Sequence, residues 1–126
     1  MLAPLLALTL AVGPAPPAPN DFERAAQANL PELLELLAIP NVASEPADIR
    51  RNAAFLEQAF QRRGFRVQQL DNPAGRPLVF AELQSTNADA STVLFYLHFD
   101  GQPVVPEEWG QPDPFVPVVK QRVGDS

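Results

Sequence analysis

Apolar residues recur at helical spacing in two stretches of the first half of the chain. In residues 21–38 they fall every three or four positions, which predicts an amphipathic helix with one buried stripe. Asn20 suits the N-cap of this helix, and Glu23 follows three residues later as a capping-box partner. Because Pro31 lies inside the stretch, the sequence predicts either a kinked helix or two helices divided at that proline.

Residues 48–63 show the clearest helical pattern. Five apolar side chains fall on one face: Ile49, Ala53, Leu56, Ala59 and Phe60. Asp48 lies where the helix dipole favours an acid, and Arg62 and Arg63 lie where it favours a base. Gly64 is suited to the left-handed position that ends many helices. The pattern therefore predicts a helix over 48–63 that packs through its apolar face.

Three strand-like runs follow these helices. Residues 65–70 alternate apolar and polar side chains, residues 78–83 are more apolar, and residues 92–97 (TVLFYL) are apolar almost throughout. Alternation is typical of a strand with one covered face, whereas a continuous apolar run is typical of a strand covered on both faces. The order helix, helix, strand, strand, strand predicts an α/β fold with 92–97 as its most buried strand.

The N-terminus has a different composition. Residues 2–12 form an apolar run, and a stiff Pro/Ala stretch follows it. About a dozen apolar residues suit the core of a signal peptide, whereas a bilayer-spanning helix needs roughly 20. We therefore expect residues 1–19 to be a secretory signal peptide with a linker, and the protein to be periplasmic or secreted. An apolar N-terminus that stays attached, or a misplaced start codon, is the alternative. Residues 20–126 form the remaining domain.

Charge and composition narrow the classes of partner and chemistry. The 126 residues suffice for one small domain, and the formal net charge is −6. No run of Lys or Arg is present, which argues against nucleic acid and against anionic lipid as partners. The chain has no cysteine and a single histidine, His98. A metal site in this protein must therefore use His, Asp, Glu and water as ligands.

The single histidine directly follows the most apolar of the predicted strands. His98 and Asp100 are two residues apart, so in extended chain both point to the same face, while Phe99 points to the other. Ligand sites of α/β sheets lie at the carboxyl ends of strands. An imidazole that binds metal usually has its second ring nitrogen held by a carboxylate, which Asp100 can supply. Taken by itself, this pattern also suits a purely structural histidine.

The sequence around His98 resembles the first active-site segment of the di-zinc peptidases. This family includes carnosinase-type dipeptidases, acetylornithine deacetylase, succinyl-diaminopimelate desuccinylase and the aminoacylases. The motif residues that follow His98 and Asp100 are Gln102, Pro103, Val104, Trp109, Asp113, Pro114 and Phe115. The resemblance covers about residues 22–120, and the Gln-Pro pair is most similar to the dipeptidase branch.

The resemblance implies the N-terminal, incomplete part of a zinc-exopeptidase-like catalytic domain. His98 would bind one of two zinc ions, and Asp100 would be the active-site carboxylate that orients the histidine. Metal-activated water would then hydrolyse the amide bond of a dipeptide or an N-acyl amino acid. The other ligands and a dimerising lid domain of the family would follow Ser126. The chain alone is expected to bind zinc weakly and to hydrolyse nothing.

The sequence leaves two alternatives open. The first is an exported binding module that keeps the peptidase fold without catalysis, and the second is an α/β fragment in which His98 is structural. The acidic pair Glu107–Glu108 lies in a proline-rich loop and suits a solvated surface better than base catalysis. If the neighbours of residues 92–97 are missing, we expect an unpaired edge, an uncovered apolar face and a tendency to aggregate.

Overall fold

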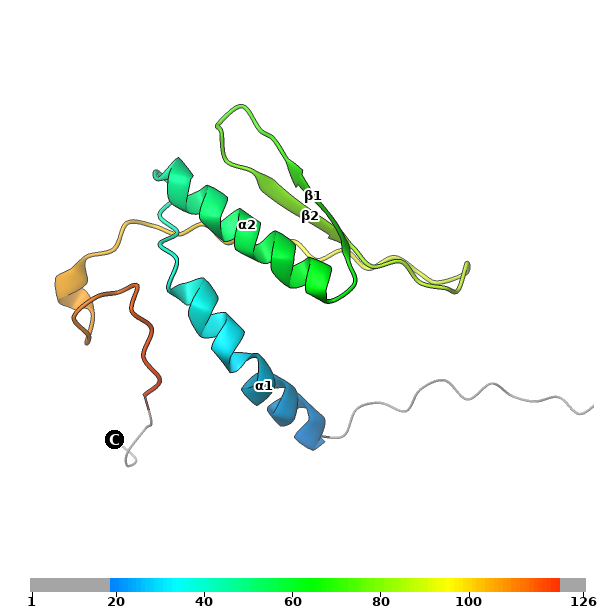
Figure 1. The fold of residues 1–126 in the computed structure, drawn as a ribbon, viewed down its shortest axis with the longest axis horizontal. Coiled ribbons are helices and arrows are strands. Elements are labelled where there is room, and N and C mark those ends of the chain that lie inside the picture. Colours follow the sequence, from blue (N-terminus) through cyan, green and yellow to red (C-terminus); the bar gives the residue numbers. More distant parts are fainter. Residues whose placement is uncertain (1–18, 121–126) are drawn as a thin grey trace, which may run out of the picture. The chain divides into compact units, whose positions relative to one another are not determined.

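The structure, a computed structural model, describes residues 19–120. The predicted signal peptide lies outside the described residues except for Pro19. The elements are α1 (Pro19–Leu37), α2 (Pro46–Arg62), β1 (Arg66–Leu70), β2 (Leu78–Glu82) and the 3₁₀ turn η1 (Pro106–Glu108) (Figure 1). This is a small α/β fold of two helices and a two-stranded antiparallel sheet. Within the described range, no helix is long and apolar enough to cross a membrane.

Helix α1 continues through Pro31, so of the two alternatives that the sequence left open, the division into two helices does not occur. The helix begins at Pro19, before Asn20, so the predicted capping role of Asn20 is wrong as well. Proline suits the first turn of a helix, where its missing N–H has no intrahelical partner. A boundary between two structural units falls inside α1, after Leu30. The predicted buried stripe is not buried, since Leu33 and Leu37 are 48% and 50% exposed.

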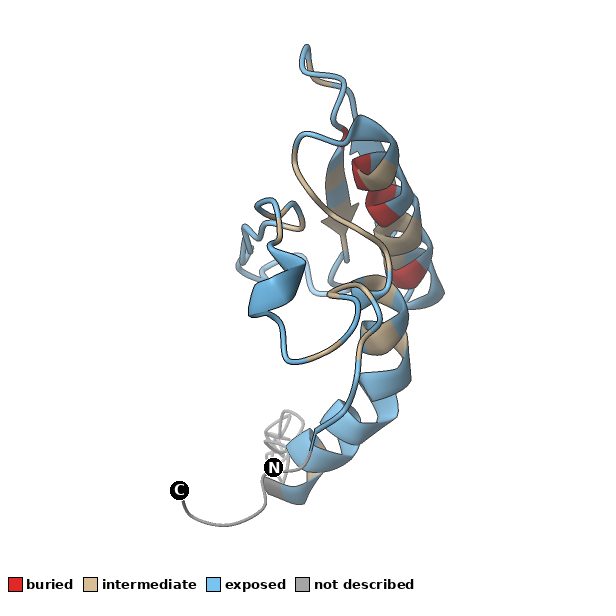
Figure 2. Ribbon diagram, turned by 90° about the vertical axis from the view of Figure 1, so that its left-hand side faces the viewer, coloured by how far each residue is buried: buried red, intermediate tan, exposed pale blue. Residues whose placement is uncertain are grey.

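Helix α2 lies against both strands of the hairpin and holds the core (Figures 1 and 2). Its buried residues are Ile49, Asn52, Ala53 and Ala59, and Leu56 and Phe60 are half-buried. The predicted apolar face is therefore confirmed, with Asn52 as an addition. The helix ends as predicted, because Gly64 has a φ of 82° and its N–H donates to the carbonyl of Gln61 (2.9 Å).

Strands β1 and β2 pair in the register that sets Arg66 opposite Glu82 and Leu70 opposite Leu78. The connection turns at Gly75, whose φ is 68°, and its N–H donates to the carbonyl of Asn72 (2.9 Å). The Asn72 side chain also accepts a hydrogen bond from the N–H of Ala74 (2.8 Å), as in an Asx turn. Both predicted strands and their turn are confirmed.

The third predicted strand is wrong. Residues 91–100 have no regular secondary structure, and the side chains from Val93 to Leu97 are 71% to 82% exposed. A strand is stable only when its backbone N–H and C=O groups pair with a neighbour. In the described residues the sheet consists of β1 and β2, and neither pairs with this run. High β-propensity therefore did not suffice to form a strand.

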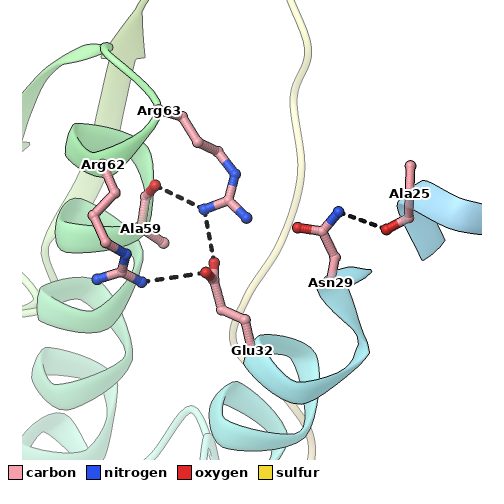
Figure 3. A network of polar contacts seen from close by, with 6 residues as sticks. All are labelled: Ala25, Asn29, Glu32, Ala59, Arg62 and Arg63. Atoms are coloured by element: carbon pink, nitrogen blue, oxygen red, sulfur yellow. Dashed lines mark hydrogen bonds and ion pairs between the residues drawn. The ribbon is translucent and has the colours of Figure 1, made fainter. Parts of the chain in front are cut away.

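A group of charges joins the last turns of α1 to the C-terminal end of α2 (Figure 3). Glu32 accepts a hydrogen bond from Nη1 of Arg63 (2.8 Å), and its other oxygen lies 3.3 Å from Nη2 of Arg62. Arg63 Nη1 also donates to the carbonyl of Ala59 (2.9 Å). The hydrogen bond from Arg63, helped by Arg62, lowers the pKa of Glu32 against a smaller opposing effect of desolvation.

Candidate functional site

The His98 ring and the Asp100 carboxylate contact each other on the surface. His98 Nδ1 lies 3.2 Å from Asp100 Oδ1, and the two side chains are 71% and 41% exposed. The Tyr96 ring meets the imidazole edge to face, with the ring centroids 5.2 Å apart. The backbone that carries the pair is irregular, although the sequence predicted the end of a buried strand. The pair therefore has the proximity expected for a held imidazole, but its surroundings are more exposed than expected.

The segment that carries this pair is tied to the loop between α1 and α2. The N–H of Gly101 donates to the carbonyl of Asn41 (2.8 Å), and the N–H of Ala43 donates to the carbonyl of Gly101 (2.9 Å). These bonds form an isolated parallel bridge between Val42 and Gly101. The Asn41 side chain adds a hydrogen bond from Nδ2 to the carbonyl of Phe99 (3.1 Å). The site is thus fixed by a contact between residues nearly 60 positions apart in sequence.

A buried side-chain amide of α2 forms a hydrogen bond with the same loop. Asn52 is 2% exposed, and its Nδ2 donates to the carbonyls of Pro40 (2.8 Å) and Asp48 (3.0 Å). Among the described residues, no buried side-chain N or O atom lacks a hydrogen-bond partner. Since a buried amide is costly unless its groups are bonded, Asn52 strongly favours this conformation of the loop.

The other motif residues lie in a loop with its own hydrogen bonds. Asp113 Oδ1 accepts from the N–H of Phe115 (2.8 Å), and Gln111 Nε2 donates to the carbonyls of Asp113 and Val116, both at 3.0 Å. Trp109 is 47% exposed. The hydrogen bonds of Gln111 and Asp113 hold the Asp-Pro-Phe segment in this loop conformation. Glu107 and Glu108 lie on η1, and both are exposed, as expected of a solvated surface.

The donor set at His98 does not make a complete zinc site. A catalytic zinc takes three protein ligands and one open position. In residues 19–120, no group of three or more His, Cys, Asp or Glu side chains is placed to hold a metal ion. The pair offers one imidazole nitrogen and one carboxylate, and these fit part of such a site.

Sequence patterns did not predict a role for three residues whose contacts hold this region in place: Asn41, Asn52 and Gly101. A signal existed for Asn52, because it occupies the apolar face of its helix three residues after Ile49 and four before Leu56. A polar residue at such a position must find partners after burial. No comparable signal existed for Asn41, whose role depends on a contact with a distant segment.

Comparison with models of known protein families, with curated proteins and with solved structures gives no match. The resemblance to the di-zinc peptidases therefore rests on the sequence motifs alone.

Proposed function

We propose that this chain carries the first metal-binding segment of a zinc-dependent peptidase. His98 is the zinc ligand, and Asp100 is the carboxylate that holds its ring. The proposal is supported above all by the 3.2 Å contact between His98 Nδ1 and Asp100 Oδ1 at an exposed position. When a carboxylate holds Nδ1–H, the lone pair of Nε2 is directed outward, which is the usual arrangement of a metal-binding histidine.

The reaction proposed for the complete enzyme is hydrolysis of the amide bond of a dipeptide or an N-acyl amino acid. A zinc ion bound there would supply a Lewis acid and an activated water. In this proposal the remaining ligands come from a longer form of the protein, since in residues 19–120 no group of three or more His, Cys, Asp or Glu side chains is placed to hold a metal ion. We also propose that the complete enzyme is exported and that it forms a homodimer through a lid domain. The 126-residue chain by itself should bind zinc weakly and show no hydrolysis.

The test uses the protein isolated from its host, whose mass shows whether sequence beyond Ser126 is present. We expect bound zinc, and we expect cleavage of dipeptides or N-acyl amino acids that stops when a chelator removes the metal. His98→Ala should lose zinc and activity while keeping its unfolding transition. Asp100→Ala should bind zinc about 10- to 100-fold more weakly. Glu107→Gln is the matched control, because it removes an exposed acidic side chain outside the pair.

The outcomes separate the three alternatives. Loss of zinc from His98→Ala with an unchanged fold supports the peptidase. Loss of the fold in that variant would instead support a structural histidine. A protein that binds no zinc and cleaves neither substrate class would support a binding module, and the proposal would be wrong.

A further inference from the structure

We propose that Asn41 is a positioning residue for the His98–Asp100 pair, and that it works together with Gly101. The two residues form what we call the clasp, in which Asn41 holds the peptide groups on both sides of Asp100. The importance of this role for metal binding rests on the proposed function, whereas the clasp itself is a matter of geometry and can be tested without metal.

Asn41 makes two hydrogen bonds with the site segment, one on each side of Asp100. Its Nδ2 donates to the carbonyl of Phe99 (3.1 Å), and its backbone carbonyl accepts from the N–H of Gly101 (2.8 Å). These groups belong to the two peptide planes that meet at the Cα of Asp100. Because peptide planes are rigid, fixing both restricts φ and ψ of Asp100. The direction of the Asp100 side chain toward His98 is set in this way.

Glycine at position 101 leaves room for the Asn41 side chain. A Cβ built on Gly101 would lie 3.0 Å from Asn41 Oδ1 and 3.3 Å from both Cγ and Nδ2 of the same side chain. The φ of Gly101 is not in the left-handed region, unlike that of Gly64 and Gly75, so backbone conformation does not require glycine. The close approach of the Asn41 amide favours glycine instead, because a Cβ there would force this side chain to move by a few tenths of an ångström.

Hydrogen bonds anchor the clasp on both sides. The residue before Asn41 is Pro40, whose carbonyl accepts a hydrogen bond from the buried Asn52 of α2 (2.8 Å). On the other side, the N–H of Ala43 donates to the carbonyl of Gly101 (2.9 Å). The clasp is therefore fixed to the helix that holds the core. The clasp therefore gives rigid support to the segment of His98 and Asp100, which contains no β-strand.

Such a support matters because the pair is exposed. A contact between two exposed side chains contributes little by itself, since each must lose rotamer freedom to make it. Sites of this kind keep their geometry only when surrounding hydrogen bonds hold the groups in place. Among the described contacts, those of the clasp restrain the backbone between His98 and Asp100.

The test measures the tautomer of His98 in the metal-free 126-residue chain. Since His98 is the one histidine, the ¹⁵N shifts of its ring in a labelled sample are assigned without ambiguity. At mildly alkaline pH we expect the Nδ1–H tautomer in the unmodified chain, because the Asp100 carboxylate accepts a hydrogen bond from Nδ1–H. Asp100→Ala defines the ratio of tautomers without the carboxylate. Asn41→Ala should move the ratio at least halfway to that value.

Gly101→Ala provides an independent variant that leaves every hydrogen-bonding group of the clasp in place. It should also move the tautomer ratio, because the new Cβ displaces the Asn41 amide. In the double variant Asn41→Ala, Gly101→Ala the collision is absent, so the second substitution should add almost nothing. Gly110→Ala is the matched control, since its nearest contact is the flexible end of Lys120 at 3.4 Å. Amide shifts of α2 and the hairpin report whether each variant keeps its fold.

Three results would overturn the inference. One is an unchanged tautomer ratio in a folded Asn41→Ala chain while Asp100→Ala changes it. Another is strictly additive effects of the two clasp substitutions. The third is no response to Asp100→Ala, since the pair would then not exist in solution. None of these measurements involves zinc, so a protein that responds as expected but binds no metal would retain the clasp and lose the proposed function.

Discussion

The α2–hairpin region, residues 46–82, and the following region, residues 83–120, are both rich in apolar residues but differ in burial. The first region contains the buried side chains of Ile49, Asn52 and Ala53. The second has no buried residue among those described, although Thr92–Leu97 is the most apolar run after the N-terminus. Apolar composition is therefore a poor guide to burial here, and the availability of a partner decides it.

The two regions find their partners over different distances in sequence. Helix α2 is followed at once by β1 and β2, so its apolar face is covered by the next 20 residues of the chain. Such local contacts cost little loop-closure entropy. Thr92–Leu97 needs a strand from elsewhere, and β1 and β2 already pair with each other. Among the described contacts, the clasp at Asn41 and Gly101 gives the second region a long-range support that is polar.

The largest expected effect comes from truncating one large aliphatic side chain in each region. Ile49→Ala removes a side chain that is 1% exposed and should lower the free energy of unfolding by about 2–5 kcal/mol. Leu94→Ala removes one that is 82% exposed and should change it by less than about 0.5 kcal/mol. Chemical denaturation followed by the circular dichroism of the helices measures both.

Equal losses in the two variants would contradict the comparison, because they would mean that Leu94 is buried in solution. The matched control is Gln58→Ala, an exposed position on α2 that tests helix propensity without removing a core contact.

The exposed run can also be tested by its tendency to associate. Light scattering should be lower for Leu94→Lys than for the unmodified chain, since a charge interrupts an exposed apolar run that is prone to associate.

The second prediction concerns the link between the two regions. Asn52→Ala removes the donor to the carbonyl of Pro40 and should destabilise the protein by about 1–3 kcal/mol. It should also loosen the loop that carries the clasp, so the amide protons of Ala43 and Gly101 should exchange faster with solvent than before. Hydrogen exchange measures both protons, and the amides of β1 serve as the internal reference. Unchanged exchange at Gly101 would show that the clasp does not depend on α2.

The sequence predicted the elements that depend on local patterns. The helix over 48–63, its end at Gly64 and the two strands followed from periodicity and turn residues, each confirmed within two residues of the observed boundary. The strand over 92–97 and the burial of the α1 stripe were wrong, because each required a distant partner that no local pattern guarantees. The sequence left open whether α1 continues through Pro31, since a proline can either kink a helix or divide it in two.

The candidate site was predictable in part for the same reason. The proximity of His98 and Asp100 follows from their spacing of two residues. The clasp was not predictable, because the contact joins Asn41 to a segment 58 residues away. The exposure of the pair was also missed, since it depends on whether the preceding run joins a sheet.

The smallest expected effect tests whether the end of α1 belongs to the stable region. The hydrogen bond from Arg63 and the neighbouring Arg62 lower the pKa of Glu32 below its ordinary value of 4.5. A carboxyl group with a lowered pKa in the folded state stabilises that state above its ordinary pKa, and this contribution disappears as the pH falls through the lowered value.

The unmodified chain should therefore lose stability as the pH falls below about 4.5, and Glu32→Gln should lose less over this interval. Because Arg62 and Arg63 are 53% and 42% exposed, the effect should be weaker than that of Asn52→Ala. Melting temperatures measured across this interval test the difference, with Glu35→Gln as the control that removes an acid from the next turn of α1. Identical pH profiles for Glu32→Gln and the unmodified chain would place the end of α1 with the loosely held part of the molecule.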